Sequence, residues 1–313
     1  MRSVPKPLHE IQIEKPAVPR MKTLAFMAHT VVEDRLIDRK TSQEIGDRNM
    51  SWKDIEVQRT GRVAVVRFDR SDNLNALSLD LMRDLLEVAR SFEQDIETTA
   101  VVLAGSAHTF SAGLDLRDPK ILEAMNAPLG MRRNLVSFGP KMCRAWEEMP
   151  QITVVAIEGH CVGGGVSLAV SCDFRIVGSG SFFRVPELQL GMNMSWQTLP
   201  RLVHLVGPAR AKRIVLLAER IDAETASNWG LADEITEDGR ALNQAVKLAE
   251  RIAELPPLPA KMTKQSINAI ANALDNATSY MDADQFMLCQ MTHDQAEAIA
   301  AFLEKRKPDF KGR

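Results

Sequence analysis

The sequence predicts an α/β fold, in which parallel strands alternate with helices and a helix-rich segment follows. Two observations favour this fold. Short apolar runs at 100–104 and 152–157 are each followed by a glycine-containing turn and then by a segment of helical character. Beyond Leu199, almost the whole chain has the pattern of helices. Alternation of strands and helices is typical of a parallel sheet covered by helices.

The size and composition of the chain fit one large domain with appendages. Its 313 residues are 45% hydrophobic, which is enough to bury a substantial core. A net charge of −2 gives no reason to expect nucleic acid or a membrane surface as a partner. The four cysteines form no C-x-x-C motif, and no apolar run reaches the roughly 18 residues of a membrane helix. We therefore expect a cytoplasmic protein.

Three regions are expected along the chain. Residues 1–53 are rich in proline and charge without a sustained hydrophobic period, which predicts a loosely ordered N-terminal extension. Residues 54–255 contain the expected strands and turns and should form the core domain. Residues 256–313 have a helical pattern, and we expect a helical region that serves as a cap or an assembly surface.

The first elements are the most regular. Alternating residues at 55–59 and 62–68 flank a Thr-Gly pair and predict a β-hairpin, followed by a polar loop over 69–75. Ser78 should cap a helix that ends near Phe92, because apolar residues recur behind it at helical spacing.

The remaining elements follow from runs of apolar residues and their spacing. Buried strands are expected at 100–104 and 152–157, with a helical region over 119–149 between them, and a further strand at 173–177. Helices are expected at 208–218, 222–229, 239–254, 259–276 and 280–306.

Two glycine turns are the most informative feature for function. They follow the strands at 100–104 and 152–157, and the second contains four glycines within 159–165. Glycine lets a ligand approach bare backbone, and a helix N-terminus presents unpaired N–H groups. Parallel neighbouring strands would bring both turns to one edge of the sheet, where α/β folds bind ligands. Two converging N–H groups would form an oxyanion hole, and two unrelated tight turns are the alternative.

Several motifs resemble those of the enoyl-CoA hydratase/isomerase (crotonase) family. They occur in order and at family spacing over about residues 54–313. The resemblance rests on residues 75–77 (NAL), 110–116 (FSAGLDL), 159–165 (GHCVGGG), 185–191 (VPELQLG), 199–207 and the tail 301–310.

The resemblance implies a core of spiralled ββα units and C-terminal helices that assemble the chain into a homotrimer or homohexamer. It also implies a coenzyme A thioester as substrate. From the residues themselves we expect no metal site, because no second Cys or His stands at ligand spacing from His160 and Cys161. We expect no separate nucleotide cofactor, because the glycines form neither G-x-G-x-x-G nor a P-loop. By position, the backbone N–H groups of Leu114 and Gly164 would form the oxyanion hole. The residues expected beside coenzyme A are Ala76, Leu77, Ala112 and Leu114, with Phe302 and Lys305 from a neighbouring subunit.

Two of these expectations have equal alternatives. Lys305 could instead be a solvated charge in a basic tail. Trp196, which follows the 185–191 motif, either lines the acyl pocket or packs at the start of a helix.

The resemblance is incomplete at the catalytic acids. Hydratases of the family use two glutamates, whereas this chain has Glu187 at one position and Ser167 at the other. A single carboxylate can move one proton between C2 and C4, so double-bond isomerisation is favoured over hydration of a 2-enoyl-CoA. Burial would raise the pKa of that carboxylate and make it a base near neutrality. Ser167 either fills the first turn of a helix or orients water or substrate.

Other chemistries stay open. Asp118 or Glu123 could replace the missing acid, while Asp115 is expected to hold its turn. Residues 165–169 (GVSLA) come close to the G-x-S-x-G elbow of serine hydrolases, so a thioester hydrolase is a further alternative. Its histidine base is not obvious, because His204 has the surroundings of a packed core residue. A non-catalytic acyl-CoA binder is the last alternative.

Overall fold

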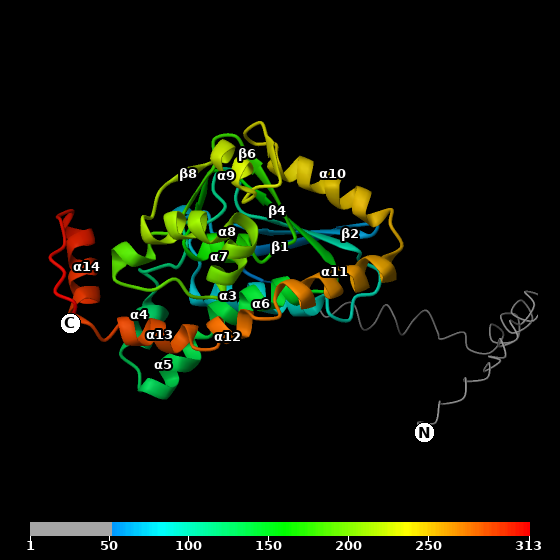
Figure 1. The fold of residues 1–313 in the computed structure, drawn as a ribbon. Coiled ribbons are helices and arrows are strands. Elements are labelled where there is room, and N and C mark those ends of the chain that lie inside the picture. The colour runs from blue at the N-terminus through cyan, green and yellow to red at the C-terminus, as the bar shows by residue number, and fades with distance from the viewer. Residues whose placement is uncertain (1–51) are drawn as a thin grey trace, which may run out of the picture. The chain divides into compact units, whose positions relative to one another are not determined.

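The computed structural model describes residues 52–313, apart from the side chains of residues 124, 125 and 276. The N-terminal extension predicted at 1–53 therefore lies almost entirely outside the described residues. Strands and helices alternate through the first part of the described chain, and helices form its last part (Figure 1). The predicted α/β fold is confirmed.

A six-stranded sheet forms the centre of the fold, in the order β1-β2-β3-β4-β6-β9. Its strands are β1 (Ile55–Thr60), β2 (Val63–Phe68), β3 (Ala100–Ala104), β4 (Ile152–Ile157), β6 (Phe174–Gly178) and β9 (Glu234–Thr236). The β1–β2 pair is antiparallel and forms the predicted hairpin, whereas the other neighbours in this sheet are parallel. The glycine turns after β3 and β4 therefore leave the same edge of the sheet.

A small second sheet continues from the second glycine turn. It consists of β5 (His160–Val162), β7 (Phe182–Arg184) and β8 (Ile221–Asp222). The sequence did not predict these strands or β9, because two or three residues are too few to establish an alternating pattern.

Helices cover both faces of the central sheet (Figure 1). Val101 and Leu103 of β3 belong to one core cluster, together with side chains of α3 and α6. Val102, between them, faces the opposite cluster, in which small alanines of α10 lie close against the sheet. The described helices of eight or more residues are α3 (Leu79–Ser91), α5 (Leu129–Val136), α6 (Phe138–Glu148), α8 (Thr198–Leu216), α10 (Ala241–Ala253), α11 (Pro257–Ala271), α13 (Asp282–Cys289) and α14 (His293–Glu304).

Shorter helices complete the fold. They are α4 (Pro119–Met125), α7 (Gly164–Ala169), α9 (Ala223–Trp229) and α12 (Asp275–Ser279), with the 3-10 turns η1 (Asn73–Asn75) and η2 (Glu187–Leu190). No helix in the part of the chain that the structure describes is long and apolar enough to cross a membrane.

Helix boundaries agree with the sequence where a capping residue marks them. Ser78 accepts a hydrogen bond from the Leu81 N–H and starts α3, as predicted. The helix predicted from 208 instead begins at Thr198, and Gly207 (φ +76°) interrupts it just before Pro208. The regions predicted as single helices at 259–276 and 280–306 each divide into two. In the second, the Thr292 side chain caps a new helix by accepting from the Gln295 N–H.

Candidate active site

The two glycine turns lie against each other, as the parallel strands require. Ser111 of the first turn forms a bridge with Cys161 of the second. The Ser111 N–H donates to the His160 carbonyl, and the Val162 N–H donates back to the Ser111 carbonyl, both at 2.9 Å. These bonds fix the backbone of the turns in register beyond the ends of β3 and β4.

Two backbone amides at this junction have no internal acceptor. Neither the Leu114 N–H nor the Gly164 N–H donates a hydrogen bond to any residue in 52–313. The segments are in close contact, because a Cβ on Gly113 would lie 3.2 Å from the Gly164 nitrogen and 2.7 Å from the Val162 carbonyl oxygen. Gly113 also has a φ of +88°, which side chains other than glycine rarely adopt. Free N–H groups held in such a frame can bind an oxyanion.

Both amides belong to residues that line one cavity of about 320 Å³, here called the glycine-turn cavity. Ser167, Glu187 and Trp196 line the same space, and so does Ala112. The structure thus brings together all four residues predicted to be catalytic. It does not by itself assign their roles, which stay predictions.

The other four residues expected beside coenzyme A do not all lie at the glycine-turn cavity. Phe302 is 65% exposed and lines the glycine-turn cavity of its own chain. Leu77 is fully buried, and its Cδ1 atom lies 3.4 Å from the place that a Cβ on Gly164 would take. Ala76 is also buried. Lys305 is exposed at the end of α14 and is not among the cavity-lining residues. Their contacts with coenzyme A, including those across a subunit boundary, stay predictions.

Glu187 presents a buried carboxylate to the cavity. It begins the η2 turn just after Pro186, and its Oε2 atom is buried without a hydrogen-bond partner. Removal of the carboxylate from water raises the pKa of Glu187 from an ordinary 4.5 to about 7. A carboxyl group with that pKa can both accept and return a proton near neutral pH.

Ser167 is fully buried and its hydroxyl is already engaged. Thr198 Oγ1 lies 2.7 Å from Ser167 Oγ and 2.6 Å from the Ser195 carbonyl oxygen. The Ser167 hydroxyl also lies 3.5 Å from the Gly163 carbonyl oxygen, which can accept its proton. The serine is therefore held as part of a hydroxyl pair.

The other acids considered from the sequence have structural roles or lie elsewhere. Asp118 accepts hydrogen bonds from the Leu79 and Lys120 N–H groups. Asp115 accepts from Arg70 at 2.7 Å, which agrees with its expected role of holding the turn. Glu123 is exposed on α4. Among the described residues, Glu187 is the only carboxylate that lines the glycine-turn cavity.

The prediction of a packed core histidine at position 204 is wrong. The His204 side chain is 40% exposed and lies 3.5 Å from Asp275. Leu202 and Val206 are one helical turn apart and point inward, whereas His204 lies between them and faces outward. No histidine of residues 52–313 lines the glycine-turn cavity, so the histidine base of a serine hydrolase has no counterpart there.

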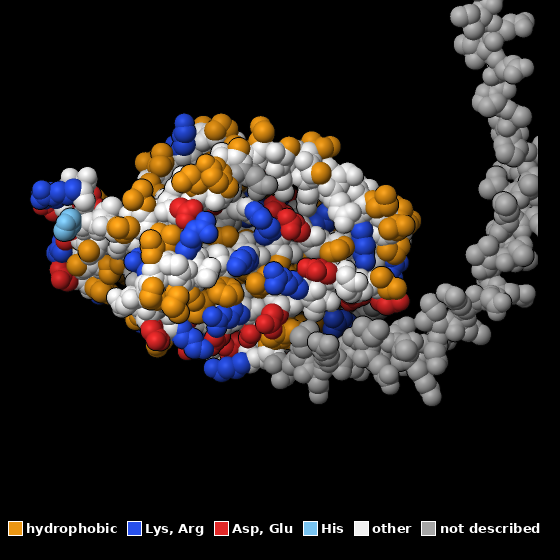
Figure 2. Space-filling model, turned by 90° about the horizontal axis from the view of Figure 1, so that it is seen from below, with side chains coloured by type: hydrophobic (Ala, Val, Ile, Leu, Met, Phe, Trp, Pro, Cys, Tyr) orange, Lys and Arg blue, Asp and Glu red, His pale blue; other side chains and the backbone are white. Residues whose placement is uncertain are grey.

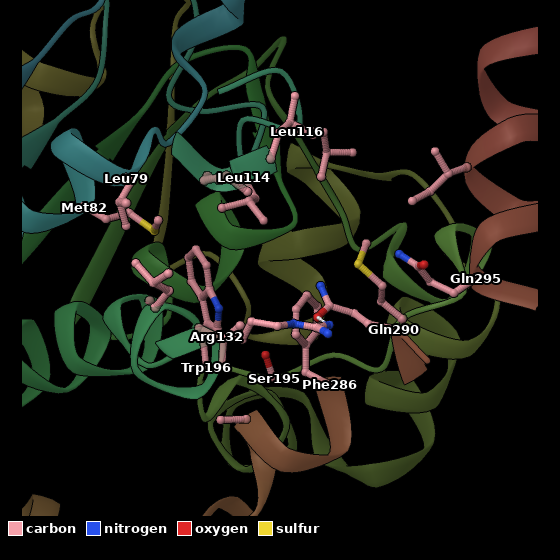
Figure 3. A pocket seen from close by; sticks show the side chains of 18 residues that line it. Leu79, Met82, Leu114, Leu116, Arg132, Ser195, Trp196, Phe286, Gln290 and Gln295 are labelled. Atoms are coloured by element: carbon pink, nitrogen blue, oxygen red, sulfur yellow. Dashed lines mark hydrogen bonds between the residues drawn. The ribbon is translucent and has the colours of Figure 1, made fainter. Parts of the chain in front are cut away.

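A second, apolar cavity adjoins the first and shares six lining residues with it, which are Leu114, Leu116, Met192, Ser195, Trp196 and Phe286. Figure 3 shows the side chains that line this second cavity. Its volume is about 180 Å³. Here called the apolar cavity, it is lined by Leu79, Met82, Leu114, Leu116, Ile121, Leu122, Arg132, Leu135, Val136, Gly139, Met192, Ser195, Trp196, Ala283, Phe286, Gln290, Gln295 and Ile299. Trp196 thus contributes to both cavities, which supports the first of its two expected roles.

Sequence reasoning missed most of this second cavity. Arg132 lies on α5, Phe286 lies on α13, and Gln290 directly follows α13. The two helices are far apart along the chain and meet only through folding. No motif marks them in the sequence. In residues 52–313, no group of three or more His, Cys, Asp or Glu side chains could hold a metal ion.

Comparison with known proteins identifies the class to which this fold and site belong. The model of the family described as "Enoyl-CoA hydratase/isomerase" matches residues 58–313. The chain therefore belongs to the enoyl-CoA hydratase/isomerase family of enzymes, as its motifs suggested.

Individual relatives agree with this assignment. The chain is 34% identical to the "Short-chain-enoyl-CoA hydratase" of Clostridium acetobutylicum, over 84% of this chain and 100% of that protein. It is 33% identical to the "Crotonyl-CoA hydratase" of Syntrophomonas wolfei, over 83% and 99% of the two chains. The crystal structure of an enoyl-CoA hydratase/isomerase from Pseudoalteromonas atlantica superposes with a TM-score of 0.74 at 26% identity, covering 83% of this chain and all of that one. The predicted crotonase-type fold is confirmed.

Proposed function

We propose that this enzyme moves the double bond of an enoyl-CoA thioester, with Glu187 as the proton carrier and the Leu114 and Gly164 amides as the oxyanion hole. One observation carries the choice of reaction. In the described part of the chain, Glu187 is the sole carboxylate lining the cavity onto which the two free amides open. One carboxylate is sufficient for a proton shuttle between two carbons.

The chemistry follows from the thioester. Glu187 takes a proton from C2 of a 3-enoyl-CoA, and the electron pair moves onto the thioester oxygen as a dienolate. Two preorganised N–H donors stabilise that oxygen, and the loss of one such donor typically costs about 3 kcal/mol of barrier. The carboxylic acid then returns the proton to C4, and a 2-enoyl-CoA is formed. A pKa of about 7 suits both steps.

Hydration of a 2-enoyl-CoA is the second candidate, because two of the similar proteins are named as hydratases. In that reaction Glu187 would have to activate the water and also deliver the proton to C2. The Ser167 hydroxyl, which contacts Thr198, would be placed to hold the water. This assignment asks two roles of one carboxylate.

Product analysis in D2O separates the candidates. The enzyme is incubated with matched 2-enoyl- and 3-enoyl-CoA esters, and products are followed by mass spectrometry and NMR. We expect the double bond to migrate without the mass of an added water. Gain of one water by the 2-enoyl ester would instead assign hydration. Absence of turnover together with tight binding of both esters would assign a non-catalytic binder.

We also propose that the enzyme is cytoplasmic, needs no separate cofactor, and assembles as a homotrimer or homohexamer. The apolar side chains of Leu258, Met262, Ile267 and Ile270 are exposed along α11, which supports an assembly role for the C-terminal helices. Figure 2 shows hydrophobic side chains interspersed with charged ones on one face of the molecule. Sedimentation velocity would test the assembly, and a monomer at micromolar concentration would contradict it.

A further inference from the structure

A charged side chain lines the otherwise mainly apolar cavity beside the site. Arg132, on α5, donates from Nη2 to the Gln290 side-chain oxygen at 3.1 Å. Its Nε is buried and has no hydrogen-bond partner. No carboxylate of residues 52–313 lies within ion-pair distance of Arg132. The guanidinium thus retains an uncompensated charge and an unused donor.

The next residue on the helix, Arg133, is an arginine that has a carboxylate partner. Arg133 forms an ion pair with Asp284 through Nε at 2.8 Å and is largely exposed. The two adjacent arginines of helix α5 therefore differ in their partners. Arg133 is paired with a carboxylate at the surface, whereas Arg132 faces the cavity without a counter-charge.

Two carboxamides accompany Arg132 at the cavity wall. Gln290 contacts it directly, and Gln295 reaches toward the same space from α14 (Figure 3). Gln295 is only 5% exposed, and its side-chain amide makes no hydrogen bond to another described residue. A buried polar atom without a partner is unfavourable, and Arg132 Nε is one, so this arrangement fits a ligand that brings an acceptor to the guanidinium.

The position of this polar group relates it to the substrate. The apolar cavity shares Leu114, whose N–H belongs to the proposed oxyanion hole, with the glycine-turn cavity. An acyl chain whose thioester carbonyl is held at that hole can therefore extend into the apolar cavity. A group at the far end of the chain would then meet Arg132.

We propose that Arg132 determines specificity by binding a carboxylate at the distal end of the acyl chain. The preferred substrates are then coenzyme A monothioesters of unsaturated dicarboxylic acids. A guanidinium is suited to this role because its planar donors match the two oxygens of a carboxylate. The inference rests on the proposed function, since it assumes an acyl-CoA ligand with its thioester at the two free amides.

Binding of saturated thioesters tests the inference independently of the reaction. Calorimetry compares adipyl-CoA with hexanoyl-CoA, and glutaryl-CoA with pentanoyl-CoA, so that each pair differs only in the terminal carboxylate. We expect the wild-type enzyme to bind the better of the two diacid esters about 10- to 100-fold more tightly than its monoacid partner. Equal affinity within both pairs would overturn the inference while leaving the proposed function intact. Failure of all four esters to bind would overturn both.

Two variants locate the preference. Arg132→Gln should remove it, because the diacid ester loses its counter-charge while the monoacid ester is unaffected or binds better. Arg133→Gln removes the same charge from the same helix outside the cavity and should leave the preference unchanged. If Arg132→Gln instead weakened both esters and free coenzyme A by the same factor, the arginine would be binding a coenzyme A phosphate, and the inference would be wrong.

Discussion

The position and the raised pKa of the Glu187 carboxylate depend on the glycine backbone that it packs against. A Cβ on Gly163 would lie 2.6 Å from Glu187 Oε1, closer than a non-bonded carbon and oxygen can approach. Glycine at this position lets the carboxylate lie against the second turn, inside the cavity. The same burial raises its pKa to about 7. The carboxylate can act as a base near neutral pH because Gly163, which has no side chain, leaves room for its buried position.

Replacement of this carboxylate should abolish turnover. Glu187→Gln keeps the shape of the side chain but cannot accept a proton, so we expect kcat to fall by about 100-fold or more. Binding of a saturated acyl-CoA should persist, because the proposed oxyanion donors are backbone groups. In the wild type, kcat should rise with pH through about 7 as the carboxyl ionises. Full activity of the variant, or a rate flat between pH 5 and 8, would refute the assignment.

The same substitution should change how stability depends on pH. Below the unfolded pKa of about 4.5 both states of the wild type are protonated, so Glu187 imposes no cost. Between that value and about 7 the unfolded chain ionises first, and wild-type stability is lost. We expect Glu187→Gln to be more stable than wild type by about 3 kcal/mol at pH 8 and equal to it near pH 4. Urea unfolding at both values measures this, and no difference at pH 8 would contradict it.

At the scale of elements, two glycines show two different reasons for lacking a side chain. One reason is a positive φ, and the other is an atom that lies where a Cβ would stand. Gly163 precedes α7 with a φ of +53°, and it donates its N–H to the Arg184 carbonyl. Gly61, in the β1–β2 hairpin, has a similar φ of +58°, but a Cβ there would meet no atom within 4 Å. The two glycines differ in their neighbours.

This contrast makes a matched pair of variants. Gly163→Ala and Gly61→Ala should both lower the free energy of unfolding, by about 1 kcal/mol or more, because both place a Cβ at positive φ. Gly163→Ala should also lower kcat at least about 10-fold, since its methyl group displaces the Glu187 carboxylate. Gly61→Ala should leave kcat unchanged. Equal activity of the two variants would show that Glu187 adapts to the methyl group.

Elements with a local signal could be predicted from the sequence, and those without one could not. The hairpin, α3 with its Ser78 cap, and strands β3 and β4 depend on patterns within a few residues. The strands β5, β7 and β8 exist because other segments supply their hydrogen bonds. His204 was misplaced because apolar neighbours indicate burial only after the rotation of the helix is known. The walls of the apolar cavity join α5 to α13, and no local pattern reveals such a meeting.

At the scale of the whole molecule, a buried ion pair fastens the C-terminal helices to the sheet. Lys264 of α11 places its Nζ 2.7 Å from Oδ2 of Asp173, the residue just before β6, and donates to the Gln151 carbonyl at 2.8 Å. Asp173 also accepts from the Thr153 N–H and hydroxyl. One lysine thus joins three segments that are distant in the sequence.

Loss of this lysine should destabilise the fold strongly. Lys264→Met keeps the length of the side chain but leaves Asp173 partly buried without its counter-charge, so we expect a loss of about 3 kcal/mol. Lys261, one turn earlier on α11, donates to the Asp95 carbonyl at 3.3 Å and forms no ion pair within residues 52–313, so Lys261→Met should cost less than about 1 kcal/mol. Chemical denaturation of both variants gives the comparison. Similar losses would mean that the ion pair contributes little to docking of α11.

The two free amides at the glycine bends have a consequence for how such an enzyme can diversify. A main-chain N–H survives almost every amino-acid replacement, so random mutation seldom deletes this part of the proposed oxyanion hole. The lining of the apolar cavity, by contrast, consists of side chains that any codon change can exchange. Under the proposed function, substrate preference can therefore change over generations of sequences while the two amides that would polarise the thioester are retained.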